Sequence, residues 1–210
     1  MGKILTFTQQ KGGAGKTSLA VHLACYWAGT GKSVALVDGD PQGSLTAWAA
    51  LRAEQEDMSP IRCETAEGWK AATVVSKLAR DHDYVLIDTA PHAETATRTA
   101  ARESDLAIVP IQPSPLDLWA SAGSLEMLAG EKKPYLAVLN RVPPRSSMAD
   151  EVAAQIVKKG LKLAKTRLGN RQDFAASFLS GRGVSEYKPR GKAADELKKL
   201  AQEIARKARG

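Results

Sequence analysis

The feature that most constrains the fold of this chain is a glycine-rich stretch at residues 9–18, Gln-Gln-Lys-Gly-Gly-Ala-Gly-Lys-Thr-Ser. An apolar run at 4–7 precedes it and an apolar helical pattern at 19–24 follows it, so it is expected to join a strand to a helix. In that setting, successive backbone N–H groups and the helix N-terminus form a binding site for phosphate. Lys16 can reach the β- and γ-phosphates of a nucleotide, and the Thr17 hydroxyl can ligate Mg²⁺.

The loop departs from the common pattern G-x-x-x-x-G-K-[ST], because Gln10 stands where that pattern has its first glycine. The sequence instead reads K-G-G-x-G-K-T, with a second lysine, Lys11, at its head. This loop resembles the deviant Walker A motif of the ParA/MinD family of ATPases. The resemblance implies that Lys11 acts beside Lys16 in catalysis by reaching across a dimer interface to the partner's nucleotide. It also implies that ATP is bound by Gly12, Gly13, Ala14, Gly15, Lys16, Thr17 and Ser18. A glycine-rich turn with a lysine on its rim is the alternative, which the matching strand-to-helix context disfavours.

Two acidic segments follow apolar runs that are typical of buried strands. Asp38-Gly39-Asp40-Pro41-Gln42-Gly43-Ser44 comes at the end of the run at 33–38, and Asp88 ends the run at 84–87. Ligands of parallel α/β sheets gather at the carboxyl ends of the strands, so both segments are expected beside the loop. The first resembles the family pattern D-x-D-P-Q-x-[NS], which implies that Asp40 positions the attacking water. The second has a Walker B pattern, and Thr17, Asp40 and Asp88 are the expected Mg²⁺ ligands. The alternative for Asp40 is that Asp40-Pro41 only caps a helix at 45–53.

Three later segments extend the resemblance. Residues 89–94 are expected to form a switch loop that senses the γ-phosphate, in which His92 is a surface residue without a catalytic role. Residues 110–118 contain P-S-P-L-D, similar to a segment near the dimer interface of short plasmid-type ParA proteins, and their prolines predict a rigid, extended loop. Trp119 is expected to pack against the protein instead of stacking on a nucleic-acid base. Asn140, at the end of a strand at 135–140, is a candidate for recognition of the adenine base.

The charge of the chain is uneven. The net charge is +7, and residues 158–209 hold fifteen Lys and Arg against five Asp and Glu. This excess indicates a polyanionic partner, either nucleic acid or an anionic membrane, although a solvated surface with nothing bound is the alternative. A helix expected at 193–208 has a narrow apolar stripe, which favours packing against the sheet over a membrane-surface role. Phe174 to Val184 loosely resembles the region in which the family ends its nucleotide pocket and carries arginines that touch DNA.

The whole chain, 1–210, is expected to form a single α/β domain of the P-loop NTPase-like type, a mostly parallel twisted sheet with helices on both faces and an edge strand within 162–171. Cys25 and Cys63 are expected to be reduced thiols, and no signal peptide or membrane span is expected. The resemblance implies a slow ATPase that dimerises with ATP and Mg²⁺, binds DNA of the nucleoid without sequence preference, and positions a cargo. A ParB-like or cargo-adaptor partner would stimulate hydrolysis in the cytoplasm. A MinD-like membrane-cycling ATPase and a metabolic P-loop enzyme are the alternatives.

Overall fold

The computed structural model describes residues 1–66, 70–91, 94–131 and 133–209. Within them, six strands form one parallel sheet in the order β3-β2-β4-β1-β5-β6. The strands are β1 (Lys3–Phe7), β2 (Val34–Gly39), β3 (Arg62–Thr65), β4 (Tyr84–Thr89), β5 (Leu106–Ile111) and β6 (Tyr135–Leu139). The helices are α1 (Lys16–Gly29), α2 (Ser44–Ala53), α3 (Lys70–Asp81), α4 (Glu94–Glu103), α5 (Pro115–Gly130), α6 (Ser147–Lys158), α7 (Gln172–Leu179), α8 (Val184–Tyr187) and α9 (Lys192–Lys207).

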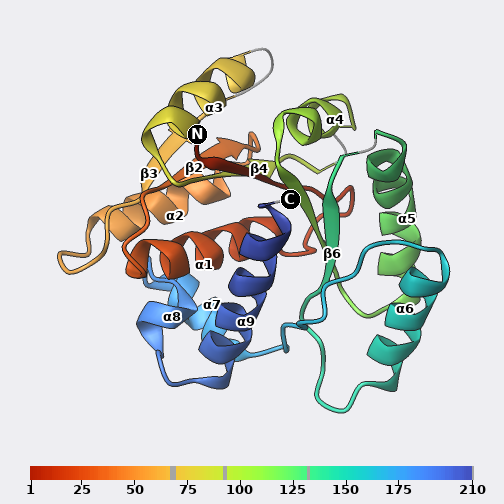
Figure 1. Cartoon of the computed structure of the whole chain (residues 1–210). Coiled ribbons are helices and arrows are strands. Elements are labelled where there is room, and N and C mark those ends of the chain that lie inside the picture. The colour runs from red at the N-terminus through yellow and green to blue at the C-terminus, as the bar shows by residue number, and fades with distance from the viewer. Residues whose placement is uncertain (67–69, 92–93, 132, 210) are drawn as a thin grey trace.

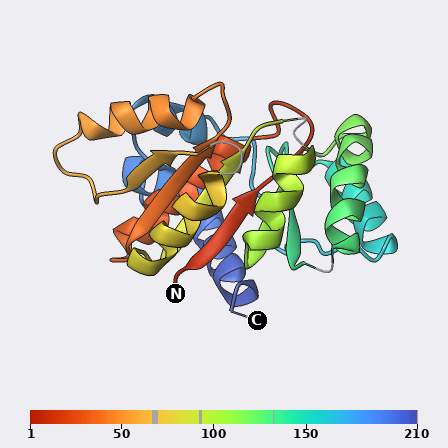
Figure 2. The same cartoon turned by 90° about the horizontal axis from the view of Figure 1, so that it is seen from above.

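The central strands are buried on both faces, which explains their unbroken apolar sequences. Successive side chains of a strand point to opposite faces, and they enter two different cores. Val34, Leu36, Tyr84 and Leu86 enter one core, and Ala35, Val37, Val85 and Ile87 enter the other. Figures 1 and 2 show α1 and α9 on one face of the sheet and α3 and α4 on the other. These layers confirm the predicted α/β fold with a parallel sheet covered on both faces.

The register of the sheet brings the acidic strand ends together. Asp88 of β4 pairs with Phe7 of β1 on one side and with Asp38 of β2 on the other. The loop that leaves β1 therefore starts beside both carboxylates, at the carboxyl edge of the sheet. This edge is where parallel α/β sheets bind their ligands.

The predicted edge strand within 162–171 is wrong. Backbone bridges join Leu163 to Ala137 and Gly169 to Val142, but no strand forms between them. The carboxylate of Glu203 on α9 explains the interruption, since it accepts hydrogen bonds from the backbone N–H groups of Lys165 and Thr166 at 2.8 and 3.1 Å. These two donors are therefore satisfied outside a sheet.

The apolar stripe of the last helix is buried, as predicted, although the main neighbours of α9 are the helices α1 and α8 and not the sheet. The prediction of an extended loop through 118 is wrong, because Pro115 is the first residue of α5. Ser114 caps this helix by accepting a hydrogen bond from the Asp117 N–H at 3.1 Å. The prediction for Trp119 is also wrong, since its side chain is 67% exposed. In the described residues, no helix combines the length and the apolar character that crossing a bilayer requires.

Candidate nucleotide site

The glycine-rich loop forms the floor of an open cavity of about 1340 Å³ at the carboxyl edge of the sheet. Gly13 and Gly15 have φ angles of +75° and +94°, which residues other than glycine rarely adopt. Gly15 is also the N-cap residue of α1 and offers no side chain to bond the first N–H groups of that helix. Those N–H groups remain available to an anion, and they lie at the positive end of the helix dipole.

Lys16 and Thr17 line the cavity, and Thr17 contacts the buried Asp88 of β4. The Thr17 hydroxyl donates a hydrogen bond of 2.5 Å to Asp88 Oδ2, whereas Asp88 Oδ1 is buried without a hydrogen-bond partner among the described residues. Burial raises the pKa of the Asp88 carboxyl to about 6, and the Thr17 hydroxyl and the Lys16 charge oppose that shift. Burial likewise lowers the pKa of the Lys16 ammonium. A buried carboxylate oxygen without a partner, next to a hydroxyl, is a suitable oxygen donor set for Mg²⁺.

The chemistry of the donors fits Mg²⁺ better than a transition metal. The described residues contain no group of three His, Cys, Asp or Glu side chains that could hold a metal ion by themselves. Mg²⁺ is usually bound by one or two protein oxygens together with phosphates and waters, so it does not need such a group. Thr17 and Asp88 therefore lie side by side, and their role as Mg²⁺ ligands stays a prediction.

The two acids that follow β2 have different surroundings. Asp38 is buried, and its carboxylate accepts from the Thr46 N–H at 2.8 Å, the Thr46 hydroxyl at 2.7 Å and the Asp40 N–H at 3.2 Å. Asp40 is half-buried, lines the cavity, and accepts from the Gln42 N–H at 3.0 Å. Gly43, and not Asp40, is the N-cap residue of α2, so the capping alternative for Asp40 is wrong. Asp38 fixes the turn, which sequence reasoning missed, and Asp40 faces the cavity.

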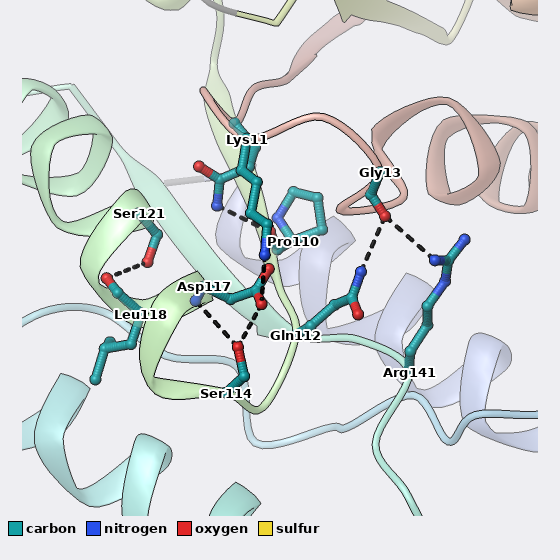
Figure 3. A network of polar contacts seen from close by, with 10 residues as sticks. Lys11, Gly13, Pro110, Gln112, Ser114, Asp117, Leu118, Ser121 and Arg141 are labelled. Carbon is teal, nitrogen blue, oxygen red and sulfur yellow. Dashed lines mark hydrogen bonds and ion pairs between the residues drawn. The ribbon is translucent and has the colours of Figure 1, made fainter.

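Lys11 lies at the head of the loop and contacts its own chain. Its ammonium is 2.9 Å from Asp117 Oδ2 on α5, and the Ser114 hydroxyl donates to the same carboxylate oxygen. Figure 3 shows these three side chains converging beside the loop. The Lys11 side chain is 41% exposed, whereas that of Asp117 is only 7% exposed. The sequence predicts that the segment at 110–118 lies close to this lysine but does not identify Asp117 as its partner.

Two side chains from the β5 and β6 ends hold the rim of the loop. Gln112 and Arg141 both donate to the carbonyl of Gly13, at 2.9 and 3.2 Å (Figure 3). Asn140, the candidate for base recognition, is buried and donates to the Ala14 carbonyl at 3.0 Å, and its own amide oxygen accepts from the Arg141 N–H. Asn140 thus braces the loop here, and recognition of a base by it stays a prediction.

The cavity extends beyond the phosphate loop. Its far wall comes from the segment at 168–172 and from α7. The resemblance of Phe174 to Val184 to the end of the family's nucleotide pocket predicts the contribution of α7, whereas sequence reasoning missed the contribution of residues 168–172. Phe174 and Phe178 of α7 lie on this wall. Apolar and aromatic walls with a few polar groups are typical of nucleotide and cofactor pockets. In the expected switch loop, residues 92 and 93, and therefore His92, lie outside the described residues.

Comparisons with known proteins agree with this arrangement. A family model described as the CobQ/CobB/MinD/ParA nucleotide binding domain matches residues 5–184. The chain is 30% identical to maintenance of carboxysome distribution protein A of Halothiobacillus neapolitanus, over 95% of each chain. It is 28% identical to the chromosome-partitioning ATPase Soj of Thermus thermophilus, over 95% of this chain and 94% of Soj. Among solved structures, the cell division ATPase MinD of Pyrococcus furiosus superimposes with a TM-score of 0.78 at 23% identity, over 98% of this chain and 99% of that one.

Proposed function

Because the chain belongs to the CobQ/CobB/MinD/ParA nucleotide-binding family, we propose that it is an ATPase that dimerises with ATP, binds DNA without sequence preference and positions or segregates a cargo. The observation that carries the proposal is that Lys16, Thr17 and Asp88 lie together next to the glycine-rich loop. This group supplies positive charge, a hydroxyl and a carboxylate oxygen without a partner, at a helix N-terminus.

In the proposed reaction, the loop N–H groups and Lys16 hold the phosphates of ATP. Thr17 and Asp88 would hold Mg²⁺, which neutralises phosphate charge when bound. Asp40 also lines the cavity, and one of its carboxylate oxygens accepts from the Gln42 N–H, so the other oxygen can orient the attacking water. Asn140 and Arg141 keep the loop in the shape that binds phosphate.

Dimerisation follows from the position of Lys11. It stands at the outer rim of the loop, and its contact with Asp117 is half-exposed, so it can leave that carboxylate for a stronger negative charge. The phosphates of a nucleotide held by a second copy would supply this charge, and each copy would then complete the site of the other. Loss of the γ-phosphate would remove this attraction and separate the two copies.

Nucleic acid is the polyanion that we propose as the partner of the basic C-terminal region. The apolar face of α9 is buried against α1 and α8, so this helix has no apolar face to insert into a bilayer. The membrane-cycling alternative therefore lacks support from α9. Two of the similar proteins are named for carboxysome distribution and for chromosome partitioning, which supports a protein assembly or a chromosome region as cargo. We place the protein in the cytoplasm at the nucleoid, with a cargo adaptor that stimulates hydrolysis.

The proposal is tested by DNA binding with ATP, with ADP and without nucleotide. We expect binding with ATP only, and a fall in affinity of ~10³ between ~50 and ~200 mM salt if ~6 phosphates are contacted. Lys16→Ala should abolish ATP binding and DNA binding together. Lys32→Ala is the matched control, because Lys32 is a half-exposed lysine at the other edge of the sheet that pairs with Asp83. Equal DNA binding in all nucleotide states, or ATP-dependent binding to anionic vesicles instead of DNA, would overturn the proposal.

A further inference from the structure

A buried arginine joins the far end of α2 to the C-terminal third of the chain. The Arg52 side chain is only 6% exposed, and its guanidinium donates to both carboxylate oxygens of Glu186, at 2.9 and 2.7 Å. It also donates to the carbonyls of Gly181 at 3.2 Å and Ser59 at 2.8 Å. The guanidinium carbon lies 5.5 Å from the centre of the Trp48 ring. One side chain of α2 thus bonds both ends of the segment at 181–186.

The same segment is seated directly on α1 and α2. Gly181 has a φ of +66°, and a Cβ there would come within 2.7 Å of the backbone of Leu51 and Arg52. A Cβ on Gly183 would come within 2.3 Å of the Cys25 side chain on α1. These contacts leave no room for the segment to slide, so a shift of α2 must be transmitted to it.

The other end of α2 lies at the nucleotide cavity. Asp38 accepts from the backbone and the hydroxyl of Thr46 in the first turn of the helix, and Ser44 and Asp40 line the cavity. The ten residues of α2 span about 15 Å as a helix. The helix α2 therefore runs from the turn that lines the cavity to the buried pair of Arg52 and Glu186.

The segment held by Arg52 leads straight into exposed cations. Tyr187 is half-exposed and Lys188, Arg190 and Lys192 are exposed, and they stand within six residues that end in the first turn of α9. Lys188 lies 3.4 Å from Asp173, an exposed contact of the kind that contributes little. Three cations and an exposed aromatic ring on one short stretch suit contacts with a phosphate backbone.

Stability alone does not explain why this ion pair is buried. Replacing a buried pair by apolar side chains of similar volume is often neutral or stabilising, because both charges must be desolvated. We propose that Arg52 is a positioning residue: it transmits the position of α2, set by the bound nucleotide, to the basic segment at 187–192 and so makes DNA affinity depend on ATP. The inference rests on the proposed function, which supplies the DNA and the dependence on ATP.

The test uses the double variant Arg52→Met/Glu186→Leu, which removes both charges and keeps the net charge. We expect ATP affinity within threefold of wild type, while the ratio of DNA affinities with ATP and with ADP falls from at least tenfold to below threefold. Arg102→Met/Glu131→Gln is the matched control, an ion pair on other elements whose arginine is exposed, and it should keep the wild-type ratio. A double variant that binds ATP and keeps the full ratio would overturn the inference.

Hydrogen exchange on the wild-type protein gives a second measurement that does not depend on a variant that folds. Amides at 181–192 should exchange at least threefold more slowly with ATP than with ADP, in the absence of DNA. Equal exchange in the two states would overturn the inference even if DNA binding depends on ATP. Conversely, a wild-type protein that never binds DNA would refute the proposed function and with it the effect on DNA affinity, while slower exchange with ATP would still show that the nucleotide is coupled to the segment at 181–192.

Discussion

Asp117 holds the lysine that the proposed dimer needs, so its charge should oppose dimerisation. The Lys11 ammonium lies 2.9 Å from Asp117 Oδ2, and this contact must break before Lys11 reaches another nucleotide. Asp117→Asn removes the negative charge, whereas its backbone N–H can still bond to Ser114 and keep the start of α5. The variant therefore releases Lys11 with little change to the fold.

The expected change in the dimer dissociation constant follows from the solvent exposure of the Lys11–Asp117 ion pair. One partner is half-exposed and the other buried, so the contact is worth about 1 kcal/mol, at the upper end of values for exposed ion pairs. Two lysines are released for each dimer, which gives about 2 kcal/mol. Since 1.4 kcal/mol corresponds to a factor of ten, the dimer dissociation constant should fall about 30-fold.

Sedimentation velocity at a series of protein concentrations, with a non-hydrolysable ATP analogue, measures this constant. Asp105→Asn is the matched control, because Asp105 also pairs with a lysine, Lys3, but lies at the opposite edge of the sheet. The control should dimerise like wild type. An unchanged or weaker dimer of Asp117→Asn would refute the reasoning, since it would mean that Asp117 does not restrain Lys11 or contributes to the dimer itself.

Three further changes test single features of the site. Gly15→Ala should lower the free energy of unfolding by at least 1 kcal/mol and weaken nucleotide binding, because the φ of Gly15 is +94° and the new Cβ would lie 2.4 Å from Asn140 Nδ2. Urea titrations measure the loss, and Gly12→Ala is the control. A Cβ at Gly12 would have nothing within 4 Å, so this variant should be tolerated. Asp88→Asn removes a buried charge whose carboxyl has a pKa raised from 3.8 to about 6, so at pH 8 we expect unfolding to cost about 3 kcal/mol more. Mg-ATP should bind at least tenfold more weakly by calorimetry, and a less stable variant would contradict this account. Burial lowers the pKa of His22 to about 4, so the unfolded chain binds a proton that the folded chain refuses between pH 6.5 and 4, and stability is lost as the pH falls through this window. From pH 7.5 to 5 this loss is about 2 kcal/mol, and urea titrations of His22→Gln should lack it; equal losses in both proteins would exclude His22.

The strands and the phosphate loop could be predicted because their signals are local. An unbroken apolar run can only be a buried strand or helix, and the glycines with the following lysine fix which elements flank the loop. The start of α5 was also readable: Ser114 followed by Pro115 is a helix-start signal, and its use would have placed Asp117 in the first turn beside the loop. Because α5 begins at Pro115, its helical periodicity buries Leu118 and leaves Trp119 exposed.

The irregular segment at 162–171 could not be predicted, because its cause is far away in the sequence. Glu203 of the last helix accepts hydrogen bonds from the N–H groups of Lys165 and Thr166. The sequence near Lys165 and Thr166 contains no signal for these bonds. The bond between Arg52 and Glu186 is similar, since its partners are 134 positions apart. Side chains that bond across such separations decide where the backbone leaves regular structure, and only the folded chain shows them.

Asp38 and Asp88 show what the structure adds to a correct motif. Both follow buried apolar runs, and the two residues are paired across the sheet. Hydrogen bonding separates them. Both oxygens of Asp38 accept bonds from the turn and from Thr46, whereas Asp88 keeps Oδ1 without a partner in the part of the chain described. A buried carboxylate oxygen that remains unbonded costs free energy unless a ligand completes it, so we propose Asp88, and not Asp38, as the acid that binds the cation.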